Sequence, residues 1–139
     1  MQKVVTDVTY IKHKGKCHYF ACYLDLFNNE ILDYELSDAF DNFLVMKPAK
    51  RILEKAKSTG TPMLLYSDQG VQYSSASYCN LLKSYDVIQS MSRAGTQEIM
   101  QLLNLFLEDS KMYCVRISNI GIVMTCRKSL TKLYIISII

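Results

Sequence analysis

The fold is decided by one stretch of sequence, LLYSDQGVQYSS at residues 64–75. The apolar residues that open this stretch predict a short buried strand, and the strand stops at a carboxylate, Asp68. Gly70 permits a tight turn, and Ser74 or Ser75 stands where a helix N-cap is expected. The stretch therefore holds an acid at the carboxyl end of a strand, which is where open α/β sheets bind ligands and metals.

A second acid stands in a similar setting near the start of the chain. Residues 3–11, KVVTDVTYI, are rich in β-branched and aromatic residues and predict a strand. Asp7 lies in the middle of this strand, where a charge is costly unless it is paired or binds a metal. Two isolated strand acids are by themselves a weak signal of a functional site, and the motifs around them are a stronger one.

Four motifs occur in order along the chain: TDVTY at residues 6–10, YLDLF at 23–27, SDQGVQYSS at 67–75 and QSMSRAG at 89–95. Together they resemble the catalytic core of bacterial insertion-sequence transposases in the retroviral-integrase superfamily, the DDE enzymes. The resemblance runs from about residue 4 to residue 95 and implies a ribonuclease-H-like fold. It also implies that transposon ends and target DNA are the partners, that the protein forms a homo-oligomer, and that Mg²⁺ or Mn²⁺ is the cofactor.

The resemblance assigns Asp7 and Asp68 to metal binding and catalysis. It places the family's third acid, a glutamate, at position 104, where this chain has Asn104. Two metal ions would activate the attacking oxygen and stabilise the leaving oxygen of an in-line phosphoryl transfer. Asn104 offers a neutral carbonyl oxygen and no charge, so we expect DNA strand transfer to fail in the chain as encoded.

After Gly95 the sequence no longer resembles the family. When residues 97–112 are back-translated with plausible codons and read two bases later, they give RNNAIIESFFGRLKN, the missing family segment with its glutamate. We therefore interpret residues 1–95 as a partial catalytic core and residues 96–139 as an out-of-frame tail that is irregular or poorly folded. If the tail is a genuine divergent C-terminus, the search for a third acid begins with Glu98, Glu108 and Asp109.

The remaining pattern predicts an α/β protein with a mixed sheet. Three antiparallel strands are expected near residues 4–11, 17–27 and 31–36, followed by alternating helices and strands. The first helix carries an apolar stripe from Val45 to Ala56, and Pro48 should kink this helix or mark its first turn. A second helix is expected near residues 75–85, then a short strand at 87–88 and a loop at 89–95.

Several polar residues are candidates for contacts with DNA. Lys47, Arg51 and Lys55 form a basic stripe on the first helix, for which a solvated face is favoured over a phosphate contact. Arg93 is the natural phosphate contact in the loop at 89–95, and Gln69 is a further candidate beside Asp68. For Asp25, on the second strand, a turn carboxylate is favoured over a metal ligand.

The length, composition and charge of the chain limit the number of domains, the partners and the location that can be expected. A chain of 139 residues with a net charge of +3 indicates one domain and permits nucleic-acid binding without arguing for it. The five cysteines lack metal-binding spacing, which favours free thiols in a reducing compartment. No apolar run is long enough to span a membrane and no signal peptide is evident, so a cytoplasmic location is expected.

Two functions follow as alternatives. The first is a fragment of a transposase core that has lost its activity; the abrupt start at the first strand also indicates a fragment. The second is a non-catalytic remnant that binds DNA weakly or associates with an intact transposase.

Overall fold

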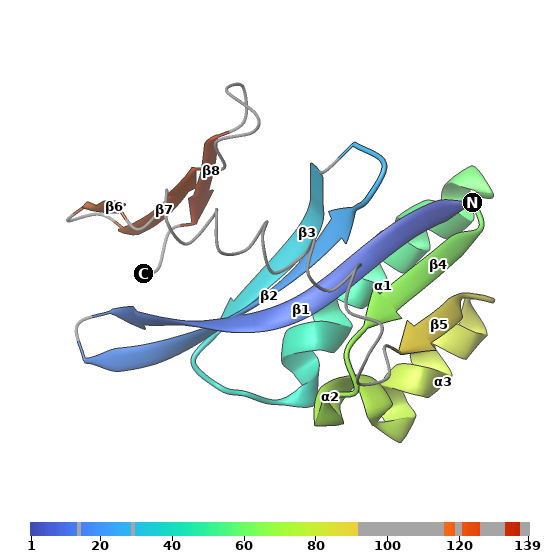
Figure 1. Ribbon diagram of the computed structural model, residues 1–139, viewed down its shortest axis with the longest axis horizontal. Coiled ribbons are helices and arrows are strands. Elements are labelled where there is room, and N and C mark those ends of the chain that lie inside the picture. Colours follow the sequence, from blue (N-terminus) through green and yellow to red (C-terminus); the bar gives the residue numbers. More distant parts are fainter. Residues whose placement is uncertain (14, 29, 92–115, 119–120, 126–132, 137–139) are drawn as a thin grey trace. The chain divides into compact units, whose positions relative to one another are not determined.

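The computed structural model describes residues 1–13, 15–28, 30–91, 116–118, 121–125 and 133–136. The chain divides into two compact units between residues 100 and 101. The first unit contains a five-stranded mixed sheet in the order β3-β2-β1-β4-β5, with its helices packed against it (Figure 1). Its strands are β1 (Gln2–His13), β2 (Lys16–Asp25), β3 (Glu30–Ser37), β4 (Met63–Ser67) and β5 (Ile88–Met91), and its helices are α1 (Asn42–Thr59), α2 (Val71–Ser74) and α3 (Ala76–Ser84).

The first three strands form the antiparallel meander that the sequence predicts. Gly15 sits in the turn between β1 and β2 with φ +77°, a conformation that favours glycine. The strand β2 ends at Asp25 and not at Phe27 as predicted, because the Asp25 carboxylate accepts the Phe27 N–H at 2.8 Å and turns the chain. Phe27 therefore leaves the sheet and is 96% exposed.

The fourth and fifth strands extend the sheet in the parallel sense. Residues of β4 pair with β5 from Leu64↔Ile88 to Ser67↔Met91. The prediction of a short strand at 87–88 followed by a loop was wrong for residues 89–91. Gln89 and Ser90 have polar side chains, but the backbone of this segment makes the ladder with β4 (Figure 1).

Helix α1 begins earlier than the proline pattern indicates. The Asp41 carboxylate caps the helix by accepting the Leu44 N–H at 3.1 Å, and Gly60 ends it in the left-handed conformation with φ +66°. Pro48 therefore lies inside α1 and does not mark its first turn, which excludes one of the two alternatives predicted for it. The predicted apolar stripe is confirmed, and its buried residues are Leu44, Val45, Pro48, Ala49, Ile52, Leu53 and Ala56.

The segment after Asp68 contains two helices where one was predicted. The short helix α2 comes first, and Ser75 then caps α3 by accepting the Tyr78 N–H at 3.3 Å. The prediction of an N-cap at Ser75 is thus confirmed, whereas α2 was missed. Its four residues are too few to show a helical period.

The core of the first unit lies between the sheet, α1 and α3. Val4, Thr6 and Val8 of β1 share a face with Tyr23 and Ala21 of β2, because residues that pair directly across an antiparallel ladder point the same way. The buried cluster on this face consists of Val4, Ala21, Tyr23, Leu44, Val45, Ala49, Ile52, Leu53, Ala56, Met63, Leu65, Tyr73, Tyr78 and Leu82.

In the second unit the structure describes three short strands, β6 (Arg116–Ser118), β7 (Gly121–Thr125) and β8 (Leu133–Ile136), which form an antiparallel sheet with β7 in the centre. The segment predicted to be irregular or poorly folded covers residues 96–139. Within this segment the structure describes the residues of these three strands. The candidate residues that lie outside the described part of the chain are Arg93, Glu98, Asn104, Glu108 and Asp109.

Candidate metal-binding site

The sheet brings the two predicted acids to neighbouring positions. Strands β1 and β4 run parallel, and their register ends with the pair Val5↔Tyr66. Asp7 lies in β1 two residues beyond Val5, so its side chain is on the face that carries Val5. Asp68 follows β4 directly, two residues beyond Tyr66. Two strands that are distant in sequence but adjacent in the sheet therefore carry the two predicted acids, Asp7 within β1 and Asp68 directly after β4.

The face of β1 that carries Asp7 is the one turned away from α1. The preceding registered pair, Val4↔Leu65, belongs to the core under α1, and the alternation along β1 places Asp7 on the opposite side. The basic stripe of Lys47, Arg51 and Lys55 is on α1. The structure thus does not bring that stripe to the Asp7 carboxylate.

The loop after β4 holds the Asp68 carboxylate in a defined turn. Its Oδ1 atom accepts the Gly70 N–H at 2.8 Å. A Cβ atom added at Gly70 would lie 2.8 Å from the same oxygen, which is too close for any real contact. Gly70 has φ −56°, so the turn does not use the conformational freedom that the sequence indicates, and an added Cβ would force the Asp68 carboxylate to shift.

Asp7 acts on a buried thiol across the ladder. Cys22 is the residue paired with Asp7 in β2 and is fully buried. Burial, together with the nearby Asp7 charge, raises the pKa of the Cys22 thiol to about 12. The thiol is therefore protonated at neutral pH and is a poor nucleophile and a poor metal ligand.

Beneath the carboxylates lies a network of buried hydroxyl groups. The Thr6 Oγ1 and Tyr73 hydroxyl atoms are 3.1 Å apart and share a hydrogen bond. The Tyr23 hydroxyl donates to the Val45 carbonyl at 2.8 Å and also contacts the Tyr78 hydroxyl at 3.0 Å. Burial raises the pKa of all three phenols well above the usual range. The sequence analysis missed this network, although Tyr73 stands inside the motif SDQGVQYSS.

Tyr73 also connects to the motif that begins at Gln89. The Gln89 Nε2 atom donates to the Tyr73 carbonyl at 2.9 Å, and the Cys79 Sγ atom lies 3.6 Å from that carbonyl and from Gln89 Oε1. These contacts tie β5 to α2 and α3.

The predicted DNA-contact residues have different environments. Arg51 donates to Asp33, Glu35 and the Tyr34 carbonyl at 2.6–3.1 Å. Lys47 lies 3.8 Å from Glu35. Gln69 is exposed directly beside Asp68. A role for any of these residues in binding DNA stays a prediction.

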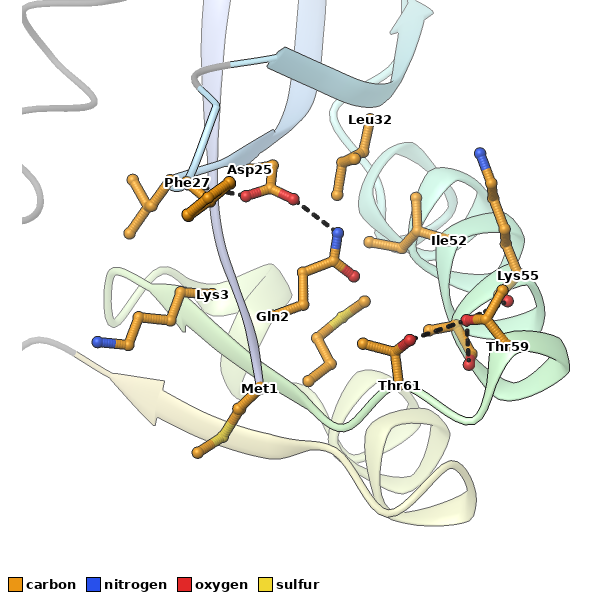
Figure 2. Close-up of a pocket in the computed structure, with 13 residues that line it drawn as sticks. Met1, Gln2, Lys3, Asp25, Phe27, Leu32, Ile52, Lys55, Thr59 and Thr61 are labelled. Atoms are coloured by element: carbon orange, nitrogen blue, oxygen red, sulfur yellow. Dashed lines mark hydrogen bonds between the residues drawn. The ribbon is translucent and has the colours of Figure 1, made fainter.

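One described cavity lies away from the carboxylates. It has a volume of about 730 Å³ and opens between the start of β1, the end of β2 and the last turns of α1. Figure 2 shows Gln2 reaching across it to Asp25, where its Nε2 donates to Oδ2 at 2.7 Å. Asp25 therefore serves two hydrogen bonds at a strand end, as the preferred interpretation of this acid predicts. Lys55 also lines this cavity, whereas Asp7 and Asp68 do not.

A metal site at Asp7 and Asp68 stays a prediction for the described residues. No group of three or more His, Cys, Asp or Glu residues that could hold an ion occurs among them. Asp7 and Asp68 nevertheless offer carboxylate oxygens, the ligands that Mg²⁺ and Mn²⁺ prefer. The pair therefore fits two ligands of a divalent cation, and position 104, expected to supply the third, lies outside the described residues.

Comparison with known proteins identifies the class. The sequence model of the family described as "Integrase core domain" matches residues 1–97. The chain belongs to this family, and its recognition as an insertion-sequence transposase catalytic core of the retroviral-integrase superfamily is confirmed. Members of the family use a divalent metal ion and act on DNA.

Two curated bacterial proteins illustrate the similarity. The putative transposase InsK of insertion sequence element IS150 from Escherichia coli (strain K12) is 32% identical over 94% of this chain and 46% of its own length. A transposase-like protein from Haemophilus influenzae is 37% identical over 81% of this chain and 51% of its own length. The chain thus spans about half the length of the curated relatives it matches.

Solved structures confirm the integrase-like fold. A chain of the simian T-cell lymphotropic virus intasome superposes with a TM-score of 0.66 at 14% identity, covering 80% of this chain and 38% of that one. The catalytic core domain of BIV integrase gives a TM-score of 0.63 at 11% identity over 80% and 67% of the two chains. The HTLV-2 integrase catalytic core, solved with magnesium in a trimeric form, gives 0.55 at 15% identity over 80% and 70%.

None of the helices among the described residues combines the length and the hydropathy of a membrane-spanning helix.

Proposed function

We propose that this chain derives from the catalytic core of an insertion-sequence transposase that joined DNA ends by metal-dependent phosphoryl transfer, and that Asp7 and Asp68 are two of its metal ligands. The observation that supports this proposal most directly is the parallel pairing of β1 and β4, since Asp7 and Asp68 each follow their last registered pair, Val5↔Tyr66, by two residues. An ion bound there would polarise a phosphate oxygen and lower the pKa of an attacking hydroxyl. The two aspartates bind and orient the ion, and the Gly70 N–H fixes one oxygen of Asp68.

The ligand assignment is tested by Mn²⁺ binding to the purified full-length chain. The loss of the free Mn²⁺ electron paramagnetic resonance signal reports binding without any need for turnover. We expect Asp7→Asn and Asp68→Asn each to weaken binding by at least about tenfold, because each removes a charged ligand. Asp33→Asn is the matched control, since it neutralises a carboxylate that lies on the α1 face. Equal binding by all four proteins would rule out the site.

We further propose that the chain as encoded does not complete strand transfer. The resemblance places a charged third ligand at position 104, where the chain has Asn104. Loss of one ligand charge removes transition-state stabilisation, and each 1.4 kcal/mol corresponds to about a tenfold lower rate. We expect no Mg²⁺-dependent DNA cleavage or joining by the purified protein. Activity that Asp68→Asn abolishes would contradict this proposal.

The same proposal assigns residues 96–139 to translation out of frame. The family match stops at residue 97, two positions after Gly95, which agrees with a change of frame near that point. The match to the IS150 protein covers 94% of the chain and so continues past residue 97, which a change of frame does not predict. The nucleotide sequence decides between a change of frame and a genuine divergent C-terminus. If the frame changed, codons 97–112 read two bases later encode the segment NNAIIESFFGRLK.

The alternative function is a remnant that binds DNA without cutting it. The exposed side chains of Lys47, Lys55 and Gln69 favour this alternative, and the net charge of +3 permits it. Binding that rests on phosphate contacts weakens steeply with salt. A gel shift that appears at low ionic strength and disappears on addition of salt would support this alternative, and the absence of any shift would oppose it.

A further inference from the structure

We propose that Tyr73 is a positioning residue that sets the placement of Asp7 relative to Asp68. The inference rests on the proposed metal site and adds to it a residue that does not itself touch the ion. It follows from one juxtaposition: Tyr73 makes separate hydrogen bonds to each of the three segments around the acid pair.

The first contact fixes the strand that carries Asp7. The Tyr73 hydroxyl shares a hydrogen bond with Thr6 Oγ1 at 3.1 Å, and Thr6 is the residue immediately before Asp7. Thr6 is fully buried on the α1 side of the sheet, so its side chain points away from the side that carries Asp7. The hydrogen bond therefore acts on Asp7 through the backbone of β1.

The second contact fixes the turn that carries Asp68. The Tyr73 N–H donates to the Gly70 carbonyl at 3.1 Å, and the Gly70 N–H donates to Asp68 Oδ1 at 2.8 Å. An unbroken path of hydrogen bonds and short backbone segments thus runs from Thr6 through Tyr73 and Gly70 to the Asp68 carboxylate. The path joins two acids that are 61 residues apart in the sequence.

The third contact extends this path to β5. The Gln89 Nε2 atom donates to the Tyr73 carbonyl at 2.9 Å, and Gln89 begins the motif QSMSRAG. Tyr73 thereby touches residues from three of the four motifs that define the family resemblance. Its side chain is 2% exposed, and its ring packs edge-on against Tyr78 with centroids 5.4 Å apart, so the phenol has a defined position.

The test breaks the Thr6–Tyr73 hydrogen bond from each side with little change of shape. Thr6→Val and Tyr73→Phe each delete one hydroxyl, Thr6→Ser keeps the hydroxyl and is the rescue variant, and Tyr78→Phe is the matched control. The control also deletes a buried tyrosine hydroxyl, but one that bonds to Tyr23 and not to β1. Each full-length protein is measured for urea stability, Mn²⁺ binding and hydrogen exchange at the Gly70 amide.

For a positioning residue, we expect Thr6→Val and Tyr73→Phe to weaken Mn²⁺ binding by about threefold to tenfold, since changes to groups that hold a metal ligand cost about 10–100-fold and this path is longer. The double variant should bind no more weakly than either single variant, because both changes remove the same bond. Thr6→Ser should bind as the parent does. Tyr78→Phe should lower stability and leave Mn²⁺ binding unchanged.

The Gly70 amide provides a readout that needs no metal. If the path holds the turn, Tyr73→Phe speeds exchange at Gly70 by about tenfold more than Tyr78→Phe does at equal global stability. If Asp7→Asn and Asp68→Asn leave Mn²⁺ binding unchanged, the metal site itself is wrong, and the exchange result still decides whether Tyr73 holds the turn. Equal exchange at Gly70 in the Tyr73→Phe and Tyr78→Phe variants would overturn the positioning role.

Discussion

Arg51 on α1 binds Asp33 on β3 through two hydrogen bonds, from Nε to Oδ2 at 2.6 Å and from Nη2 to Oδ1 at 3.1 Å. The same Nη2 atom donates to Glu35 and to the Tyr34 carbonyl. The guanidinium group therefore joins α1 to the edge strand of the sheet. Its donors serve the chain's own acceptors, which favours a structural role for the centre of the predicted basic stripe.

We predict that Arg51→Gln lowers the free energy of unfolding by about 1 kcal/mol, because it removes a bidentate ion pair that is part of a network. Lys55→Gln is the control, since it makes the same charge change four residues later on the same helix. Urea unfolding should separate the two variants, while low-salt gel shifts should change equally. A larger loss of DNA binding in Arg51→Gln, with stability unchanged, would favour the phosphate contact.

The sequence predicts most of the sheet because its signals there are local. The strands around Asp7 and Asp68 are marked by β-branched and apolar residues, and the order of the four motifs then predicts that the two acids meet. Residues 89–91 were misassigned because Gln89 and Ser90 give no apolar signal, although their backbone pairs with β4. The pairing of such a polar segment with a neighbouring strand is set by tertiary structure and not by the local sequence.

The contacts that organise the candidate site are not local, and this is why the sequence could not predict them. The Thr6–Tyr73 bond joins residues 67 positions apart, and no spacing rule selects Tyr73 over the other nine tyrosines. The glycine at position 70 was predicted for a conformational reason, whereas its φ of −56° suits any residue and the atom nearest to an added Cβ is the Asp68 oxygen, at 2.8 Å. Both facts depend on side-chain positions.

We predict that Gly70→Ala disturbs the Asp68 carboxylate more than it disturbs the fold. The added methyl group would displace Asp68 Oδ1 and break its bond to the Gly70 N–H, so Mn²⁺ binding should weaken by about tenfold, as for other changes next to a ligand. Gly60→Ala is the control. It forces alanine into the left-handed region at the end of α1, at a cost of about 1 kcal/mol of stability, with no atom near the site.

A contrary result for this pair is easy to recognise. If both alanine variants lose stability equally and bind Mn²⁺ as the parent does, the turn at Gly70 tolerates a side chain and the close approach to Asp68 has no bearing on metal binding.

We predict that the fold loses stability steeply at alkaline pH. The pKa of Cys22 rises from its ordinary value of 9.0 to about 12 in the folded protein, and the pKa values of Tyr23, Tyr73 and Tyr78 rise above 10.0. Between the unfolded and folded pKa values the folded state binds more protons, so stability falls as pH rises. Each group contributes up to about 1.4 kcal/mol per pH unit over its own window.

Urea unfolding at a series of pH values tests this prediction and assigns its parts. The free energy of unfolding should begin to fall near pH 9, because the Cys22 thiol ionises in the unfolded chain. It should fall more steeply above pH 10, as the phenols ionise in the unfolded chain. The Cys22→Ala variant should lack the fall in stability that begins at pH 9 and should keep the steeper fall above pH 10. A stability that is flat from pH 9 to pH 11 in the parent protein would contradict the burial of these groups.

The buried hydroxyl group of Ser67 on β4 differs in its hydrogen bonding from that of Thr6 on the neighbouring strand β1. Both hydroxyl groups are fully buried, but Thr6 Oγ1 bonds to Tyr73, whereas Ser67 Oγ has no hydrogen-bond partner within the described part of the chain. An unsatisfied buried hydroxyl costs about 1–3 kcal/mol. We therefore predict that Ser67→Ala raises the free energy of unfolding by about 1 kcal/mol and that Thr6→Val lowers it by a similar amount. Urea unfolding of the two variants side by side measures the opposite signs, and a loss of stability in Ser67→Ala would show that the hydroxyl is satisfied in solution.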